Sequence, residues 1–285
     1  MIAVTGASGG VGSRVAKRLA AAGTASRLLV RDPEKLADAG IGASHPGGAA
    51  VIGGYDDVEG LRKALDGIDT LFLIPAHETP DRVDLHRNVI EVASDIGVSH
   101  IVYLSFLRPD GLESPSFTLM RDHWDTEDIL TESGLVTTFL RMTLYMDFLP
   151  LMVGEDGAIR GPAGEGRFAP ICRDDIADSA AAVLGDPDAH AGAVYNLTGP
   201  ELLNFEDIAA ALTIHGDRKV EYVDETIEEA YRSREKFNAP DWQVEAWVGT
   251  YLSIARGELE FVGDGVPTLT RQPATTLATF LRQQT

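Results

Sequence analysis

Near its start the chain carries a cluster of glycines whose spacing suits the binding of a phosphate group. Residues 5–12 read Thr-Gly-Ala-Ser-Gly-Gly-Val-Gly and lie between an apolar run and a helical pattern. Glycines make such a turn tight and let a pyrophosphate approach the backbone, while the N–H groups of a helix N-terminus attract the anion. We therefore predict a dinucleotide site. The predicted contacts are Gly6, Ala7, Ser8, Gly9, Gly10, Val11 and Gly12.

Arg31 indicates which dinucleotide is bound. It follows the apolar residues 28–30, where an acidic residue would accept a ribose hydroxyl of NAD and an arginine would meet the 2′-phosphate of NADP. A guanidinium can pair with phosphate through two hydrogen bonds. Asp32 could be misread as the acidic residue, but Pro33 after it favours a helix cap. The pattern predicts NADP(H), and Arg14 either helps to hold the same phosphate or is an ordinary surface arginine.

Short apolar runs alternate with helical patterns, and these elements must position the glycine turn. The runs cover 2–5, 27–30, 50–52, 70–74, 101–105, 137–140 and 193–196. This alternation is typical of a parallel sheet with helices on both faces. Gly23, Gly97 and Gly134 stand where three of the helices should end. We predict an α/β protein with a Rossmann-type, doubly wound parallel sheet and a smaller, mostly helical C-terminal lobe.

The same rhythm predicts the domain boundaries. The expected parts are an NAD(P)-binding domain at 1–144, an excursion into the substrate lobe at 145–168, a return to the core at 169–200, and mainly lobe at 201–285. Within the excursion, the glycine-rich stretch 154–166 is expected to be a loop. Residues 173–175 are expected to cap the helix 176–184. Beyond residue 205 we expect helices without clear strand alternation.

Composition restricts the partners and the compartment. The 285 residues include 24 basic and 44 acidic ones, a formal net charge of −20, which repels nucleic acids and anionic membranes. Cys172 is the single cysteine, so neither an internal disulfide nor a thiolate metal cluster can form. We expect a cytoplasmic monomer or homodimer that acts on a small molecule and binds no metal, nucleic acid or membrane.

The Gly-x-x-Gly-x-x-Gly spacing resembles the short-chain dehydrogenase/reductase superfamily. Members usually carry a tyrosine that exchanges a proton and, four residues later, a lysine that binds the ribose. When Glu127 is matched to the glutamate after this pair, His123 takes the lysine position and Leu119 the tyrosine position. The resemblance therefore implies a site without the usual acid. His123 would bind the ribose or, with a pKa near neutrality, act as a catalytic proton relay, unless it is a surface histidine.

This departure and several other stretches resemble the NmrA-like, atypical branch of that superfamily, including its bacterial quinone oxidoreductases and triphenylmethane-dye reductases. The similar stretches are 1–7, 86–90, 123–127, 161–166 and 273–277. Met142 departs from the pattern, because the quinone reductases have a substrate-side asparagine there. Quinones and cationic dyes delocalise the charge that a hydride brings, so such a site can work without the tyrosine.

Further site residues are expected beyond the carboxyl ends of the strands, where parallel sheets bind ligands. Asp56 resembles the superfamily aspartate that contacts adenine, or else it forms a turn. Tyr145 either stacks on the substrate or replaces the missing catalytic acid, unless it belongs to the core. The other positions expected to line the cofactor are Ile74, Pro75, Ala76, Ser105 and Phe106.

Together these features imply an NADPH-dependent oxidoreductase that transfers hydride to a quinone-like or conjugated aromatic acceptor. Two other interpretations stay open. One is a non-catalytic, NADP(H)-binding redox sensor that signals to a protein partner. The other is a reductase or isomerase of a specialised metabolite.

Overall fold

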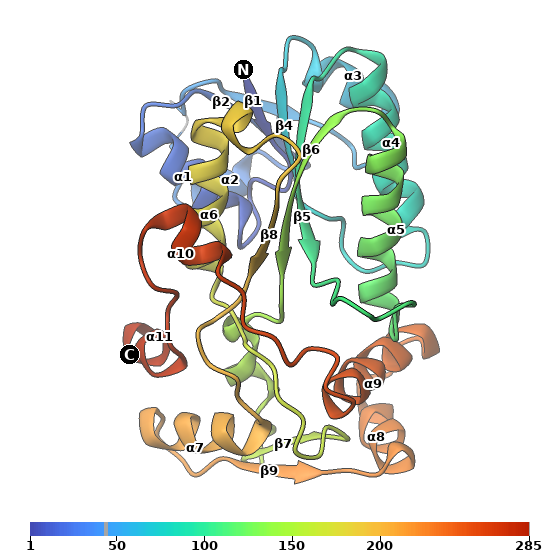
Figure 1. The fold of residues 1–285 in the computed structure, drawn as a ribbon, viewed down its shortest axis with the longest axis vertical. Helices are drawn as coiled ribbons and strands as arrows, with labels where there is room; N and C mark the ends of the chain where they lie inside the picture. The colour runs from blue at the N-terminus through green and yellow to red at the C-terminus, as the bar shows by residue number, and fades with distance from the viewer. Residues whose placement is uncertain (43–44, 285) are drawn as a thin grey trace.

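A parallel sheet forms the centre of the molecule in the computed structural model, which describes residues 1–42 and 45–284 (Figure 1). In this part of the chain the sheet has seven strands in the order β3-β2-β1-β4-β5-β6-β8. The strands are β1 (Ile2–Val4), β2 (Ser26–Val30), β3 (Ala49–Val51), β4 (Thr70–Leu73), β5 (His100–Phe106), β6 (Val136–Met142) and β8 (Val194–Leu197). Each overlaps one of the apolar runs, so the predicted sheet is confirmed. The order reverses at β1, which pairs with both β2 and β4.

Helices cover both faces of the sheet, as expected of a doubly wound fold. On one face α1 (Gly12–Ala21) packs against α6 (Arg173–Gly185), and α2 (Glu34–Asp38) follows β2. On the other face α3 (Val58–Leu65), α4 (Arg82–Asp95) and α5 (Thr118–Glu132) lie side by side (Figure 1). Successive residues of β4 enter different cores, Leu71 on the α3–α5 side and Phe72 on the α1–α6 side. This alternation follows from the two-residue repeat of a strand.

The ends of the helices were predicted with mixed success. Gly23, Gly97 and Gly134 each end a helix with a positive φ, of 74°, 85° and 76°, as expected of C-terminal glycines. The predicted cap of α6 is wrong, because α6 already begins at Arg173 and no side chain caps it. The carboxylates of its first turn have other partners: Asp174 binds α1, and Asp175 accepts hydrogen bonds from the N–H and the hydroxyl of Thr275 at 2.7 and 2.8 Å.

A lobe lies beyond the carboxyl ends of the strands (Figure 1). Its helices include α7 (Phe205–His215), α8 (Ile227–Arg234) and α9 (Asp241–Ala255). It also contains a two-stranded parallel sheet of β7 (Ala158–Gly161) and β9 (Glu221–Asp224), so the predicted loop at 154–166 is wrong. Beyond residue 205 helices dominate as expected, and in the described part of this region β9 is the one strand. Each strand has four residues and finds its partner about sixty positions away, a pairing that leaves little local signal.

The chain leaves the lobe again near its end. The N–H of Gly263 donates a hydrogen bond of 3.0 Å to the hydroxyl of Thr198, and α10 (Gly265–Thr270) packs on α6 and β8. The last helix, α11 (Leu277–Gln284), packs on α7. Within the described ranges, no helix combines the length and the apolar character that a bilayer crossing requires. Those ranges also contain no group of three side chains arranged to hold a metal ion.

Candidate functional site

The glycine turn joins β1 to α1 at the point where the strand order reverses. Gly6 has a φ of 56°, in the left-handed region. A Cβ on Gly12 would lie 2.3 Å from the carbonyl oxygen of Gly6, so only glycine allows the helix to start this close to the strand. Across the described residues, the backbone N–H groups of Gly10 and Val11 donate no hydrogen bond. These two groups are therefore available to an anion.

The rest of the turn divides into an inner and an outer side. Ala7 is fully buried and its N–H points to the carbonyl oxygen of Leu29, 3.4 Å away. Ser8 is half-buried, whereas Gly9 and Gly10 are exposed. The surface open to a ligand thus consists mainly of backbone.

The residues after β4 lie beside the turn. The hydroxyl of Thr5 accepts a hydrogen bond of 2.8 Å from the N–H of Ile74. The Ile74 side chain lies 3.6 Å from the place where a Cβ on Gly6 would be. The phenol of Tyr55 donates to the Ile74 carbonyl at 2.6 Å. Pro75, which follows, is partly exposed.

Two side chains from α4 hold Ala76. Its N–H donates to Nε2 of His86 at 2.9 Å, and its carbonyl accepts from Nε of Arg82 at 2.9 Å. His86 must therefore carry its proton on Nδ1, which donates to the hydroxyl of Thr126 at 2.8 Å. Burial, followed by the charge of Arg82, lowers the pKa of His86 to about 3. The loop 74–76 is thus fixed by a neutral imidazole.

At the end of β2, Arg31 is exposed and forms no hydrogen bond or ion pair with any described residue. Asp32 accepts a hydrogen bond of 3.0 Å from the N–H of Glu34, which supports its interpretation as a capping residue. After β3, Asp56 is exposed, and the turn is instead fixed by Asp57, which accepts from the N–H groups of Gly53 and Gly60 at 2.7 and 3.0 Å.

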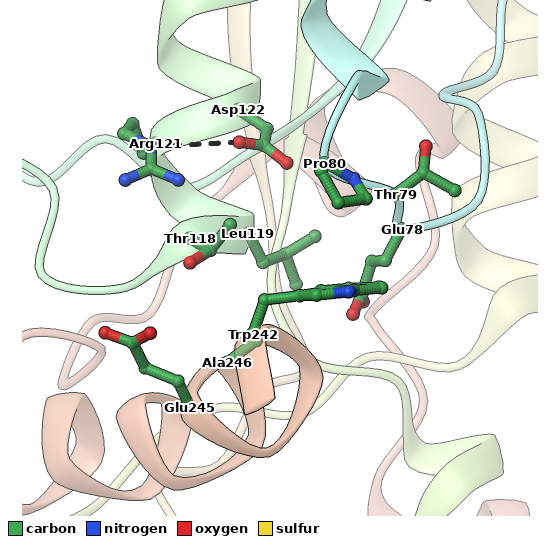
Figure 2. A pocket seen from close by; sticks show the side chains of 10 residues that line it. All are labelled: Glu78, Thr79, Pro80, Thr118, Leu119, Arg121, Asp122, Trp242, Glu245 and Ala246. Atoms are coloured by element: carbon green, nitrogen blue, oxygen red, sulfur yellow. Dashed lines mark ion pairs between the residues drawn. The ribbon is translucent and has the colours of Figure 1, made fainter. Parts of the chain in front are cut away.

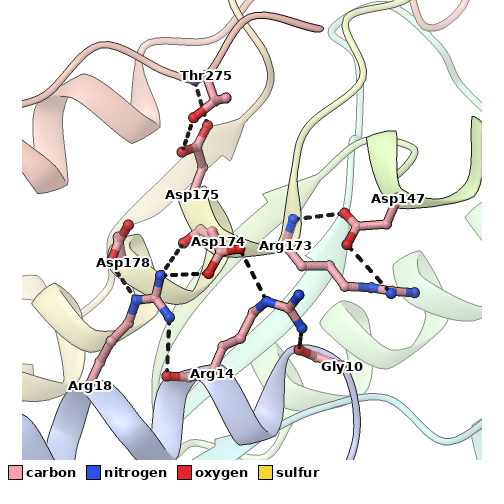
Figure 3. A network of polar contacts seen from close by, with 9 residues as sticks. All are labelled: Gly10, Arg14, Arg18, Asp147, Arg173, Asp174, Asp175, Asp178 and Thr275. Atoms are coloured by element: carbon pink, nitrogen blue, oxygen red, sulfur yellow. Dashed lines mark hydrogen bonds and ion pairs between the residues drawn. The ribbon is translucent and has the colours of Figure 1, made fainter. Parts of the chain in front are cut away.

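Arg14 belongs to a surface network between α1 and α6 (Figure 3). Its Nε lies 3.2 Å from a carboxylate oxygen of Asp174, and Nη1 donates to the carbonyl of Gly10 at 2.7 Å. Arg18 binds the same Asp174 and also Asp178. Of the two alternatives for Arg14, this arrangement favours the ordinary surface arginine.

His123 lies inside the molecule, so the surface-histidine alternative is wrong. The side chain is 0% exposed, and its Nδ1 is 3.0 Å from the hydroxyl of Tyr103. Burial first, then the charges of Arg82 and His86, lower the pKa of His123 well below its ordinary value. The expected pKa near neutrality is therefore wrong, because an imidazole without water disfavours the charged form. It stays neutral at physiological pH.

Three buried polar atoms near the carboxyl ends of β5 and β6 have no hydrogen-bond partner among the described residues. They are the hydroxyl oxygens of Ser105 and Thr143 and Nε2 of His123. Phe106 is also fully buried, with its ring centroid 6.0 Å from that of His123 and 5.8 Å from that of Phe117. An unpaired buried polar atom costs about 1–3 kcal/mol. A polar ligand bound beside these three atoms would compensate the cost.

Tyr145 follows β6 and begins the short helix η1 (Met146–Met152). Its ring lies 5.7 Å from that of Phe148, and the guanidinium of Arg173 lies 5.1 Å from its centroid. Burial raises the pKa of Tyr145 to about 12, with Arg173 opposing the shift. Its hydroxyl has no hydrogen-bond partner among the described residues. Tyr145 is partly buried and packs against the main hydrophobic cluster, so the core alternative stays open beside the two site roles.

A pocket of about 220 Å³ opens between the loop after β4, the start of α5 and the start of α9. Figure 2 shows the indole of Trp242 lying across it beneath Leu119, with Arg121 and Glu245 on one side and Glu78 on the other. The full lining is Glu78, Thr79, Pro80, Thr118, Leu119, Arg121, Asp122, Trp242, Glu245 and Ala246. The pocket thus offers an aromatic face, an apolar side chain and a surplus of carboxylates.

One carboxylate of this pocket is perturbed. Asp122 has 9% of its side chain exposed, and burial raises its pKa to about 6, while Arg82 and Arg121 oppose the shift. The nearest nitrogen of Arg82 is 3.9 Å away, too far for a hydrogen bond. Asp122 therefore keeps a proton to a higher pH than an ordinary aspartate.

Sequence reasoning missed Trp242 and the position of Arg173. Trp242 comes from the lobe, and no motif marks α9. Thr143 follows β6, where the strand-end rule also places Tyr145. The sequence indicates for Arg173 only a place at the start of a helix.

Comparison with known proteins agrees with this geometry. The sequence profile of a family described as NAD(P)H-binding matches residues 6–187. The chain belongs to this family. Quinone oxidoreductase 2 of Escherichia coli (strain K12) is 33% identical over 98% of this chain and 96% of its own length. The NAD(P)H azoreductase of Xenophilus azovorans is 30% identical over 99% of this chain and 97% of its own.

Solved structures confirm both the fold and the resemblance seen in the sequence. The E. coli quinone oxidoreductase with bound NADPH superimposes with a TM-score of 0.87 at 30% identity, covering 100% of this chain and 99% of that one. Triphenylmethane reductase of Citrobacter sp. with NADP(H) gives 0.83 at 29% identity, covering 100% and 99%. NmrA, a negative transcriptional regulator, gives 0.77 at 17% identity, covering 99% and 94%, which shows the fold alone.

Proposed function

We propose that this protein is an NADPH-dependent oxidoreductase that transfers hydride to a quinone-like or conjugated aromatic acceptor. The observation that carries the proposal is the pocket in which Leu119, at the position of the superfamily's tyrosine, faces the indole of Trp242. A flat acceptor can pack between an apolar side chain and an aromatic ring. The whole-chain similarity to a quinone oxidoreductase and an azoreductase supports this choice.

The residues of the turn fit the cofactor. We propose that the free N–H groups at Gly10 and Val11 bind the pyrophosphate, together with the other turn residues Gly6, Ala7, Ser8, Gly9 and Gly12. Arg31 would bind the 2′-phosphate and Asp56 the adenine. Ile74, Pro75, Ala76, Ser105 and Phe106 would line the rest of the site. When bound, NADPH supplies the hydride.

His123 and Tyr145 take different proposed roles. Because His123 is neutral and buried, it would act by position, as part of the wall formed with Ser105 and Thr143. Tyr145 is protonated at neutral pH and no described residue bonds its hydroxyl, so it is our candidate for a proton donor to the reduced acceptor, although its raised pKa makes it a weak acid. Asp122, whose pKa is about 6, is a second candidate in acid solution.

The lobe would supply the acceptor side of the site, in line with the proposed division at residues 145–168 and 201–285. Trp242 and Glu245 come from α9, and a second hollow sharing Thr118, Arg121 and Glu245 extends the pocket toward α8. The net charge of −20 supports a small-molecule substrate rather than a nucleic acid. We propose a cytoplasmic monomer or homodimer.

Turnover is tested by mixing the purified protein with NADPH and a panel of neutral quinones, azo compounds and cationic dyes, and by following the nicotinamide absorbance. We expect oxidation with at least one class. In Trp242→Ala the KM for that acceptor should rise up to about tenfold, because an aromatic contact contributes about 0.5–1.5 kcal/mol. Phe261→Ala, a change of an exposed aromatic outside the pocket, should have no effect. No oxidation above background with any acceptor would contradict the proposal.

A further inference from the structure

The guanidinium of Arg173 lies directly over the glycine turn. A Cβ added to Gly10 would be 3.0 Å from Nε of Arg173 and 3.1 Å from its Cδ and Cζ. Gly10 precedes Val11, and the N–H groups of both residues have no acceptor in the described structure. A strongly positive group and two free donors thus face the same space.

Other side chains hold Arg173 in this place without using its hydrogen bonds. Its Cζ lies 5.1 Å from the ring centroid of Tyr145 and 4.8 Å from that of Phe148. The nearest carboxylate oxygen, on Asp147, is 3.6 Å from Nη1, beyond hydrogen-bond distance, while Asp147 accepts a bond of 3.1 Å from the backbone N–H of Arg173 (Figure 3). Among the described residues, none accepts a hydrogen bond from the guanidinium.

The neighbouring arginines differ in this respect. Arg14 and Arg18 both bind Asp174 of α6 (Figure 3). Arg14 also donates to the carbonyl of Gly10 in the turn, and Arg18 to the carbonyl of Arg14 in α1. Arg173 has 24% of its side chain exposed, so its free N–H groups can be reached from the turn. A guanidinium fixed against aromatic rings has a reduced entropic cost when it binds phosphate with two parallel hydrogen bonds.

We propose that Arg173 binds the pyrophosphate of the cofactor together with the N–H groups of Gly10 and Val11. Through its contact with the Tyr145 ring it also positions the proposed proton donor relative to the bound cofactor. The inference rests on NAD(P)H binding by this family and holds whether or not turnover occurs.

Binding of NADP⁺ to Arg173→Gln tests the proposal without any acceptor. By fluorescence titration at low salt, the Kd should rise about 10- to 100-fold, the range for a lost hydrogen bond to a charged group. Arg173→Lys keeps the positive charge but loses the planar guanidinium. Its Kd should lie between those of the parent and Arg173→Gln. Arg62→Gln, a change of an exposed arginine on α3, is the control and should bind as the parent does.

Two further measurements separate binding from structure. The ratio of the Kd values of Arg173→Gln and the parent should shrink as salt is raised, because salt screens a charge contact. The urea midpoint of Arg173→Gln should stay close to that of the parent. A Kd within twofold of the parent would overturn the proposal. A weakened Kd that is independent of salt and accompanied by a lowered urea midpoint would also overturn it, since Arg173 would then only hold η1 to α6.

Discussion

The guanidinium groups of Arg173 and Arg31, both near the glycine turn, donate no hydrogen bond to any described residue, and Arg173 forms only a 3.6 Å ion pair with Asp147. Their surroundings favour different functions. Arg173 is fixed against two aromatic rings and faces Gly10. Arg31 is exposed at the end of β2 and has no partner among the described residues. A side chain at the end of this strand discriminates between NAD and NADP by contacting the 2′-hydroxyl or the 2′-phosphate of the adenosine ribose.

Arg31→Gln should therefore change the choice of cofactor. We expect the Kd for NADPH to rise about 10- to 100-fold, as for a lost charged hydrogen bond, while the Kd for NADH stays the same. Titration of both cofactors by fluorescence measures this. Arg62→Gln is again the control. If NADH binding weakens by the same factor as NADPH binding, Arg31 does not meet the 2′-phosphate.

Tyr145 is the residue to change if the proton comes from the protein. Tyr145→Phe keeps the ring contacts with Phe148 and Arg173 and removes only the hydroxyl. We expect kcat to fall by at least about 100-fold, within the roughly 10²–10⁴-fold range of general acid catalysis, while the KM and the Kd for NADPH stay unchanged. Tyr195→Phe, on β8 and bonded to His190, is the matched control. An unchanged kcat would mean that solvent or another group supplies the proton.

At the scale of elements, α5 is held to β6 by a buried ion pair. Glu127 has 2% of its side chain exposed and receives two hydrogen bonds from Arg141, at 2.9 and 2.6 Å. This pair also fixes the helix that carries Leu119, His123 and the perturbed Asp122. Breaking a buried pair by removing one partner leaves an uncompensated charge.

Glu127→Gln should consequently destabilise the fold by about 3–5 kcal/mol, measured by urea denaturation at neutral pH. The control is Asp128→Asn, the next residue on α5, whose partner Arg108 is at 2.7 Å but on the surface. That change should cost less than about 1 kcal/mol. If the free energy of unfolding falls equally in the two variants, the buried Glu127–Arg141 pair stabilises the fold no more than the surface pair does.

The sheet and the glycine turn could be predicted because their signals are local. Each apolar run coincides with a strand, and the spacing of the turn glycines is set by contacts within a few residues, such as that between Gly6 and Gly12. The missed features all depend on distant partners. β7 pairs with β9 across about sixty residues, Trp242 reaches Leu119 from the lobe, and Arg173 reaches Gly10 from α6.

At the scale of the whole molecule, a row of rings runs behind the candidate site. Tyr55, His86, Tyr103, His123 and Phe106 follow one another with centroid separations of 6.3, 6.0, 5.8 and 6.0 Å. The row joins the turn after β3 with α4, β5 and α5. Its two imidazoles are neutral, because burial lowers the pKa of both.

This row gives stability a pH dependence whose sign can be worked out. In the unfolded chain both histidines take up protons as the pH falls below about 6.5, whereas in the folded chain His86 does so only near 3 and His123 well below its ordinary value. Their contribution is complete above pH 6.5 and is lost as the pH falls. Asp122 acts in the opposite direction, because its pKa in the folded chain is raised to about 6. Between pH 6 and 4 the folded chain therefore binds about one proton more at this carboxylate than the unfolded chain, which stabilises the fold as the pH falls.

His86 and His123 against Asp122 leave a net uptake of about one proton on unfolding, and burial also lowers the pKa of His45 and His100, which adds uptake in the same direction. The free energy of unfolding should therefore fall by at least about 1.4 kcal/mol per pH unit between pH 6 and 4. Urea denaturation at pH 7, 6, 5 and 4 measures this slope. His86→Gln should be less stable at pH 7, because the substitution changes the hydrogen bond to Ala76. The dependence of its free energy of unfolding on pH should nevertheless be less steep, since one group fewer takes up a proton on unfolding. His77→Asn, at an exposed position, should keep the parent slope. If His86→Gln also keeps the parent slope, His86 is not a group that resists protonation in the folded chain. The loop 74–76 would then be fixed by Arg82 and Thr5 instead.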